Sequence, residues 1–214
     1  MRTSGGDVEV ADAGDHVFLQ RHGGPRYRPP HLIDHAANMA ALTEAGCDRV
    51  LALSSVGSLR RDLGVGAFVC PDDFISLAPG PTGRDDEGGH LIPGFSPAWR
   101  ERVLAAWPGN GSAPRDGGVY WQSPGPRLET AAEVRLIAAH ADVVGMTVAS
   151  ECVLANESGL DYAVVCMVDN MANGVEDEAG PTGPLSMEDV TAGVAANRPR
   201  LLGALGSAVP ELAT

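Results

Sequence analysis

The fold of this chain is indicated most clearly by residues 125–174, GPRLETAAEVRLIAAHADVVGMTVASECVLANESGLDYAVVCMVDNMANG. Two segments of this stretch, residues 130–139 and 150–158, have the apolar spacing of helices. Each is followed by a short apolar segment, residues 143–145 and 162–168, that is typical of a buried strand. Helices and strands in alternation predict an α/β protein with a central, mainly parallel sheet.

The alternation continues on both sides of this stretch. Upstream, helices are expected over residues 30–45 and 97–106, and extended segments over residues 17–20, 50–53, 67–77 and 118–122. Residues 78–97 are rich in Pro, Gly and Asp and are expected to form a long loop. Downstream, Ser186 and Asp189 resemble a helix start, and Pro199 is expected to kink or divide that helix. Residues 1–214 are therefore predicted to form one domain, a three-layer α/β/α sandwich around a mixed sheet.

Composition excludes several classes of function. The formal net charge of -13 argues against a nucleic-acid groove, which needs a basic face. The chain has no lysine, which excludes Schiff-base chemistry and a phosphate loop of the Walker type. No apolar run approaches the about 20 residues of a membrane span and no signal-peptide core is visible, so a cytoplasmic protein is expected. The 4 cysteines form no CxxC pair and are expected to be buried thiols.

Polar side chains occur where the predicted strands end. They are Arg21 and His22, Ser54 and Ser55, Met146 and Thr147, and Asp169 and Asn170. Ligands of open α/β sheets bind beyond the carboxyl ends of the strands, so one composite site is expected there. An arginine, an imidazole and small hydroxyls supply donors for an oxyanion such as phosphate, and a carboxylate with an amide can recognise a base. Such a site suits the attack of an anion on an anomeric carbon with departure of a nitrogen base.

Each of these residues has a simpler interpretation when it is taken alone. Arg21 and His22 could be a surface pair, Ser54 and Ser55 a turn cap, and Met146 a core residue. His31 and His35 lie one helical turn apart and could bind a metal, but the sequence places no third ligand nearby, so no metal site is expected. Glu129 and Glu133 lie at a helix start, where the macrodipole favours acids whatever their function.

Several motifs together point to one family. They are Phe18-Leu19-Gln20-Arg21-His22-Gly23, Pro29 to Ile33, Ala37 to Leu42, Ser54 to Leu59, Gly125 to Thr130 and Gly145 to Glu151. In order and spacing they resemble the methylthioadenosine phosphorylase branch of the trimeric purine nucleoside phosphorylase family. The resemblance covers residues 18–174. It implies phosphorolysis of a purine nucleoside by a homo-oligomer, expected to be a trimer, with phosphate as co-substrate, no metal or organic cofactor, and no nucleic-acid or membrane partner.

The resemblance also implies roles for individual residues. Phosphate would be held by Arg21, His22, Ser54 and Thr147, with a backbone N–H lent by Ser55. Leu128, Glu129 and Met146 would line the base and ribose pocket. Asn170 would contact N7 of the purine and stabilise charge that develops only in the transition state. His90 of the long loop would reach the 5′ pocket of a neighbouring subunit.

Glu129 indicates the class of base. The branch that prefers 6-aminopurines resembles Gly-Pro-Arg-Phe-Ser at this place and has aspartate at the base-reading position, where this chain has Leu128-Glu129 and Asn170. A carboxylate accepts a hydrogen bond from N1–H, which inosine and guanosine have and adenosine lacks. The expected substrate is therefore a nucleoside of the inosine, guanosine or 5′-methylthioinosine type, with catalysis dependent on Asn170, Glu129 and His22.

The sequence also departs from the family pattern. The family begins with a strand and a Gly-Gly-Ser-Gly turn that complete the phosphate site, and the sequence begins after that segment. Loss of a core strand exposes a sheet edge and removes hydrogen-bond donors. Three outcomes stay open: weakened phosphate binding, a phosphate-independent nucleosidase that uses water, or a non-catalytic relative that binds a purine or a protein.

Overall fold

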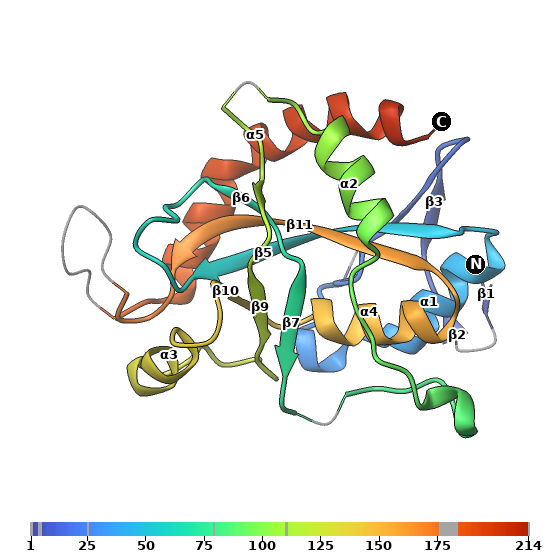
Figure 1. The fold of residues 1–214 in the computed structure, drawn as a ribbon, viewed down its shortest axis with the longest axis horizontal. Helices are drawn as coiled ribbons and strands as arrows, with labels where there is room; N and C mark the ends of the chain where they lie inside the picture. Colours follow the sequence, from blue (N-terminus) through green and yellow to red (C-terminus); the bar gives the residue numbers. More distant parts are fainter. Residues whose placement is uncertain are drawn as a thin grey trace.

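The computed structural model describes residues 2–3, 6–24, 26–78, 80–109, 111–175 and 184–213. A seven-stranded sheet lies at its centre, with the strand order β7-β9-β10-β5-β11-β6-β8 (Figure 1). Its strands are β5 (Arg49–Ser58), β6 (Phe68–Cys70), β7 (Asp73–Ser76), β8 (Arg115–Asp116), β9 (Val119–Gln122), β10 (Val143–Gly145) and β11 (Asp161–Met171). Only β10 with β5 and β11 with β6 pair antiparallel in this sheet as described, and the other pairs are parallel. The prediction of a mixed, mainly parallel sheet is confirmed.

Helices cover both faces of this sheet and so form the outer layers of the sandwich (Figure 1). They are α1 (His35–Glu44), α2 (Pro97–Ala106), α3 (Ala131–Ile137), α4 (Val148–Glu157) and α5 (Met187–Leu212). Strand β11 serves both layers, because Val164 and Val168 pack with α1 and α4 while Val165 and Met167 pack with α2 and α5. A strand that is buried on both faces must be apolar throughout, which explains the continuous apolar run that predicts it.

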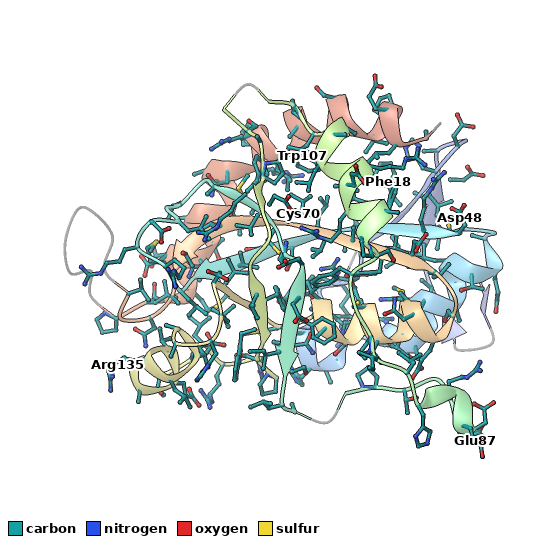
Figure 2. All side chains as sticks on the ribbon, viewed as in Figure 1. Phe18, Asp48, Cys70, Glu87, Trp107 and Arg135 are labelled. Carbon is teal, nitrogen blue, oxygen red and sulfur yellow. The ribbon has the colours of Figure 1, made fainter. Side chains whose placement is uncertain are left out.

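The core on the α2 and α5 side is closed by aromatic packing. Trp107, at the C-terminal end of α2, meets Phe68 of β6 edge to face with ring centroids 5.4 Å apart (Figure 2). Edge-to-face packing suits the quadrupoles of two aromatic rings. This cluster packs α2 and α5 against one face of the sheet.

Two small hairpins at the N-terminal end stand apart from the main sheet. They are β1 (Arg2–Thr3) with β2 (Gly6–Asp7), and β3 (Val10–Asp12) with β4 (Val17–Leu19). Val8, Val10 and Leu19 pack against Ala37 and Ala41 of α1. This packing fixes the end of β4, which leads directly into the segment that contains Arg21 and His22.

Strand β5 has an edge that is open over most of its length. Arg49 to Val56 pair with β11 on one side, whereas on the other side β10 reaches only Gly57 and Ser58. Within the described residues no other strand covers that edge. Backbone N–H and C=O groups of a central strand therefore face a cavity and need partners from solvent or a ligand.

Two helix predictions are corrected. Residues 30–45 do not form one helix: a 3₁₀ turn over Pro30–Leu32 comes first, and α1 begins at His35 because Asp34 caps it, with Oδ1 accepting from the N–H of Ala37 at 2.9 Å. Helix α5 is continuous across Pro199, so the predicted division is wrong. A capping box of Ser186 and Asp189 starts α5, as expected, and side chains buried on the sheet hold it beyond the proline.

Two strand predictions are also corrected. Strand β5 runs on to Ser58, so Ser54 and Ser55 lie within the strand and not at its end. The stretch predicted over residues 67–77 forms two strands, β6 and β7, that are not neighbours in the sheet.

Helix α2 and strand β10 have the expected bounds, and α4 begins two residues earlier than expected. The long loop contains a 3₁₀ turn, η2, over Glu87–Gly89, and Glu87 lies at its outer end (Figure 2). In the described part of the chain, no helix is both long and apolar enough to cross a membrane.

Candidate active site

A cavity of about 1160 Å³ opens along β5. Its polar end collects all but one of the predicted site residues, which are Arg21, His22, Ser54, Ser55, Leu128, Glu129, Met146, Thr147 and Asn170. They come from the segment after β4, from β5, from the loop before α3, from the turn between β10 and α4, and from β11. The volume exceeds that of common ligand pockets, roughly 300–1,000 Å³, because the cavity also follows the open edge of β5 to apolar residues of α5.

Arg21 is the central cation of the polar end. Its Nη1 donates to Thr147 Oγ1 at 3.1 Å, and its Nε lies 2.8 Å from Glu151 Oε1. Thr147 is the N-cap residue of α4, but its hydroxyl makes no capping hydrogen bond. The hydroxyl therefore serves the cavity, next to a helix N-terminus whose dipole favours an anion. Because α4 begins at Val148, Thr147 is brought to this position.

Glu151 is a residue of this cluster that the sequence analysis did not assign. It is 2 % exposed, and its Oε2 accepts from the hydroxyl of Tyr162 at 2.7 Å, while His35 Nδ1 lies 3.8 Å from Oε1. Burial opposes ionisation, but attraction to Arg21, aided by His35 and Tyr162, holds the pKa of Glu151 below its ordinary value. The available signal was an acid in the first turn of α4, between the apolar residues Ala149 and Cys152.

His22 has a defined ring orientation. Its Nδ1 donates to the carbonyl oxygen of Arg28 at 2.9 Å, and its ring stacks on Tyr27 with centroids 5.5 Å apart. The carbonyl can only accept, so Nδ1 carries the proton and Nε2 is the nitrogen that meets a ligand. Burial, reinforced by the charge of Arg21, lowers the pKa of His22 although the bond to Arg28 opposes this.

Asn170 and Glu129 also line the cavity. Strand β11 carries an irregularity between Val168 and Asn170, which changes the direction of the strand before Asn170. Asn170 Nδ2 donates to the carbonyl of Met171 at 2.8 Å. Glu129 has a buried Oε1 with no hydrogen-bond partner among the described residues, and Asn173 Nδ2 donates to its main-chain carbonyl at 3.0 Å. A buried acceptor without a partner is costly unless a ligand supplies the donor.

Glu133 differs from Glu129, although both lie at the start of α3. It completes a capping box with Thr130, and its carboxylate pairs with Arg127 at 2.7 Å. The hydrogen bonds from Arg127 lower the pKa of Glu133 to about 2. The structural interpretation of Glu133 is therefore confirmed.

Met146 lines the cavity beside Gly125, where a Cβ atom would come within 2.7 Å of the Met146 sulfur. Gly125 also has a φ of 62°, so glycine is needed there for two reasons. Ser54 is buried and Ser55 is exposed to the cavity, both on β5.

His90 is the predicted site residue that lies elsewhere. It is exposed at the end of η2 and does not line the cavity of its own subunit. Of the two histidines with helical spacing, His31 lies in the 3₁₀ turn and only His35 in α1. Among the described residues, no group of three side chains is arranged to hold a metal ion.

The family described as the Phosphorylase superfamily matches residues 2–207. An Archaeoglobus fulgidus protein named "Probable 6-oxopurine nucleoside phosphorylase" is 42% identical over 174 residues, which are 81% of this chain and 72% of that protein. A Pseudomonas syringae pv. tomato protein named "Probable S-methyl-5'-thioinosine phosphorylase" is 41% identical over 180 residues, 79% of this chain and 73% of that protein. The structure of methylthioadenosine phosphorylase from Schistosoma mansoni in complex with tubercidin matches with a TM-score of 0.77 at 25% identity, over 95% of this chain and 79% of that one.

Proposed function

The chain belongs to the phosphorylase superfamily, and from this premise we propose that it is a purine nucleoside phosphorylase of the pentosyltransferase type. It cleaves the N-glycosidic bond of a 6-oxopurine nucleoside with phosphate and releases the free base and a pentose 1-phosphate. The observation that carries the proposal is that two sets of groups with different chemistry line one cavity. One set offers cationic and hydroxyl donors, and the other offers a buried carboxylate oxygen that has no hydrogen-bond partner among the described residues.

Phosphate binding is assigned to the end around Arg21. The guanidinium, the hydroxyl of Thr147 and the N-terminus of α4 converge there, and Ser54 and Ser55 line the same end. His22 presents Nε2, which can accept a proton from a phosphate hydroxyl or donate once protonated. These groups hold the anion for attack on the anomeric carbon, opposite the departing base.

Base recognition is assigned to Glu129 and Asn170. The carboxylate of Glu129 accepts from N1–H of a 6-oxopurine, and Asn170 contacts N7. The base leaves with negative charge developing on its ring, and the transition state of such a cleavage is oxocarbenium-like. Hydrogen bonds that strengthen as this charge develops lower the barrier more than they tighten substrate binding. Met146 and Leu128 pack on the sugar and base between the two ends.

The reaction needs no metal or organic cofactor, since the donors for the anion and for the base are side chains of the cavity. We place the protein in the cytoplasm as a single domain. All four cysteines are free thiols, the state that a reducing compartment favours.

The active unit is a homo-oligomer, a trimer, in which His90 of one subunit completes the 5′ end of the neighbouring site. Support comes from the loop itself. Ile92, two residues after His90, is 99% exposed, and Leu77 at the start of the loop is 78% exposed. Large apolar side chains in this state favour burial against another surface.

The test is base release from inosine, guanosine and 5′-methylthioinosine, each with and without phosphate in an otherwise phosphate-free buffer. Strict dependence on phosphate is expected. Release that is indifferent to phosphate would make the protein a nucleosidase, an alternative favoured by the open edge of β5 beside the anion end. Ligand-induced stabilisation without any release would identify a non-catalytic purine-binding relative.

A further inference from the structure

Glu151 is a fully buried carboxylate that the proposed chemistry does not use. It lies on α4 at 2 % exposure, one turn after Thr147. Burial of a charge is expensive unless the charge is paired and hydrogen-bonded. Glu151 meets both conditions through Arg21 and Tyr162. Its partners are Arg21, which is assigned to phosphate binding, and Tyr162, which is buried in the core. The contact between Glu151 and Arg21 therefore concerns phosphate binding as well as stability.

The guanidinium of Arg21 contacts two different side chains. Nε faces Glu151 Oε1 at 2.8 Å, and Nη1 donates to Thr147 Oγ1 at 3.1 Å. A guanidinium is a rigid plane, so holding Nε on one side and Nη1 on another fixes the direction of all its donors. The remaining N–H groups then have a fixed direction in the cavity that Arg21 lines.

The orientation of Glu151 is itself fixed from a second side. Tyr162, at the start of β11, is fully buried and donates to Oε2 at 2.7 Å. His35 of α1 lies 3.8 Å from Oε1. The carboxylate is thus held between α1, α4 and β11, three elements that belong to the same side of the core.

We propose that Glu151 is a positioning residue that orients Arg21 for the binding of phosphate, with Tyr162 holding Glu151 in turn. The inference rests on the proposed phosphate site. Glu151 does not touch the anion, and it acts only through Arg21. Its removal therefore weakens phosphate binding when Arg21 is present and has no effect on phosphate binding when Arg21 is absent.

The experiment is a double-mutant cycle read by calorimetric titration with inorganic phosphate, which needs no turnover. In the chain with Arg21, Glu151→Ala is expected to raise the Kd for phosphate at least tenfold. Glu151→Gln is expected to raise it only about threefold, because Gln keeps an acceptor for Nε of Arg21. Tyr162→Phe is also expected to raise it about threefold. In the Arg21→Ala background, each change is expected to alter the Kd less than twofold. Hypoxanthine binding, which depends on Glu129 and Asn170, is expected to stay within twofold in all variants.

The outcomes separate the inference from the proposed function. Equal losses of phosphate affinity with and without Arg21, or parallel loss of hypoxanthine binding, would mean that Glu151 only supports the fold and would overturn the inference. If Glu151→Ala does not fold, Tyr162→Phe and Glu151→Gln decide, because both keep the core filled. An unaltered protein that fails to bind phosphate would overturn the inference. Phosphate binding without phosphate-dependent base release would instead refute only the proposed function.

Discussion

Glu129 and Glu133 differ in what surrounds each carboxylate, and this difference decides which of them serves the substrate. Glu129 has a buried oxygen without a partner among the described residues, whereas Glu133 is engaged by Arg127 and the start of α3. Glu129→Gln is expected to lower kcat/KM for inosine about 10- to 100-fold, since N1–H then meets a neutral amide in place of a charged carboxylate. Adenosine lacks N1–H, so its kcat/KM is expected to stay unchanged or to rise.

The measurement is the ratio of kcat/KM for inosine to that for adenosine. Glu133→Gln is the matched control, because it removes a carboxylate of the same size, four residues further along. That variant is expected to keep the ratio of the unaltered protein. A ratio that falls equally in both variants would show that Glu129 does not read the base.

His22 predicts a dependence of stability on pH. Its pKa in the folded protein is lowered, chiefly by burial, so the unfolded chain binds more protons in the interval from that lowered pKa up to about 6.5. The contribution of His22 to the free energy of unfolding is therefore fully present above that interval. The free energy of unfolding falls as the pH drops through the interval. The His22→Gln variant can still donate a hydrogen bond to the carbonyl of Arg28 but does not titrate. Its free energy of unfolding should therefore fall less than that of the unaltered protein over the same interval of pH.

Urea unfolding at about pH 7.5 and about pH 5.5 checks this, with and without saturating phosphate. Phosphate favours the imidazolium if it binds beside His22, and it should then reduce the loss of stability at low pH only in the unaltered protein. The same pH dependence in both proteins would remove His22 from the anion end.

At the residue level, sequence motifs predicted side chains that line the cavity, but not the residues that support them. Arg21, Thr147 and Asn170 stand at strand or segment ends, where a local pattern can identify them. Glu151 and Tyr162 meet across the core from α4 and β11. Nothing in the spacing of a single segment encodes that contact.

At the level of elements, α5 fixes the irregular part of β11. Asn197 Nδ2 donates to Asp169 Oδ1 at 2.9 Å and to the carbonyl of Val168 at 3.2 Å. Gly193 lies so close that an alanine Cβ would clash with the carbonyl oxygen of Asp169. These contacts hold the residue before Asn170, so α5 controls where the side-chain amide of Asn170 lies.

Asn197→Ala is therefore expected to cost about 1–3 kcal/mol of unfolding free energy, because it leaves the buried Asp169 without that donor. It should also lower kcat at least severalfold, since Asn170 loses its fixed position. Arg198→Ala, an exposed change on the same helix, should stay within about 0.5 kcal/mol and keep kcat. Denaturant titration and steady-state kinetics on both variants check this, and an unchanged kcat for Asn197→Ala would show that α5 only stabilises the fold.

The elements also show where local patterns fail. The strands and most helices follow their apolar periodicity, and α2 and β10 match their expected bounds. Pro199 is the exception, because local chemistry predicts a break whereas α5 stays continuous. Contacts on either side of the proline, from Asn197 to β11 and from Ala204 onward to the core, outweigh the lost backbone hydrogen bond.

At the scale of the whole molecule, the loop that carries His90 bears on the proposed trimer. It is anchored at both ends, since Glu157 accepts from the N–H of Gly83 at 2.7 Å and Asn156 accepts from the N–H of Gly94 at 2.8 Å. Between these anchors the loop carries His90 and the exposed Ile92, whereas α3 lies at the opposite end of the molecule, as the labels Glu87 and Arg135 show (Figure 2). An anchored loop with an exposed apolar tip is suited to pack on a neighbouring subunit.

Light scattering after size exclusion is expected to give a mass three times the 22.1 kDa of the chain. Ile92→Asp should shift the protein to a smaller species, because a charge would be buried at the interface. Leu136→Asp, at another exposed apolar position, on α3, should leave the trimer intact. A monomeric mass for the unaltered protein would contradict the shared site.

Subunit complementation tests whether His90 and Asn170 of different chains meet in one site. Asn170→Ala removes the base-reading amide and is expected to abolish turnover, while His90→Ala should lower kcat/KM for 5′-methylthioinosine about tenfold. In mixed trimers, some sites form between a His90→Ala chain, which supplies the cavity, and an Asn170→Ala chain, which supplies the loop. Such a site contains both natural residues. Co-expression should therefore restore activity above that of either variant alone. If His90 acted within its own subunit, every site in the mixture would carry one of the two changes, and activity would not exceed the average of the two parents.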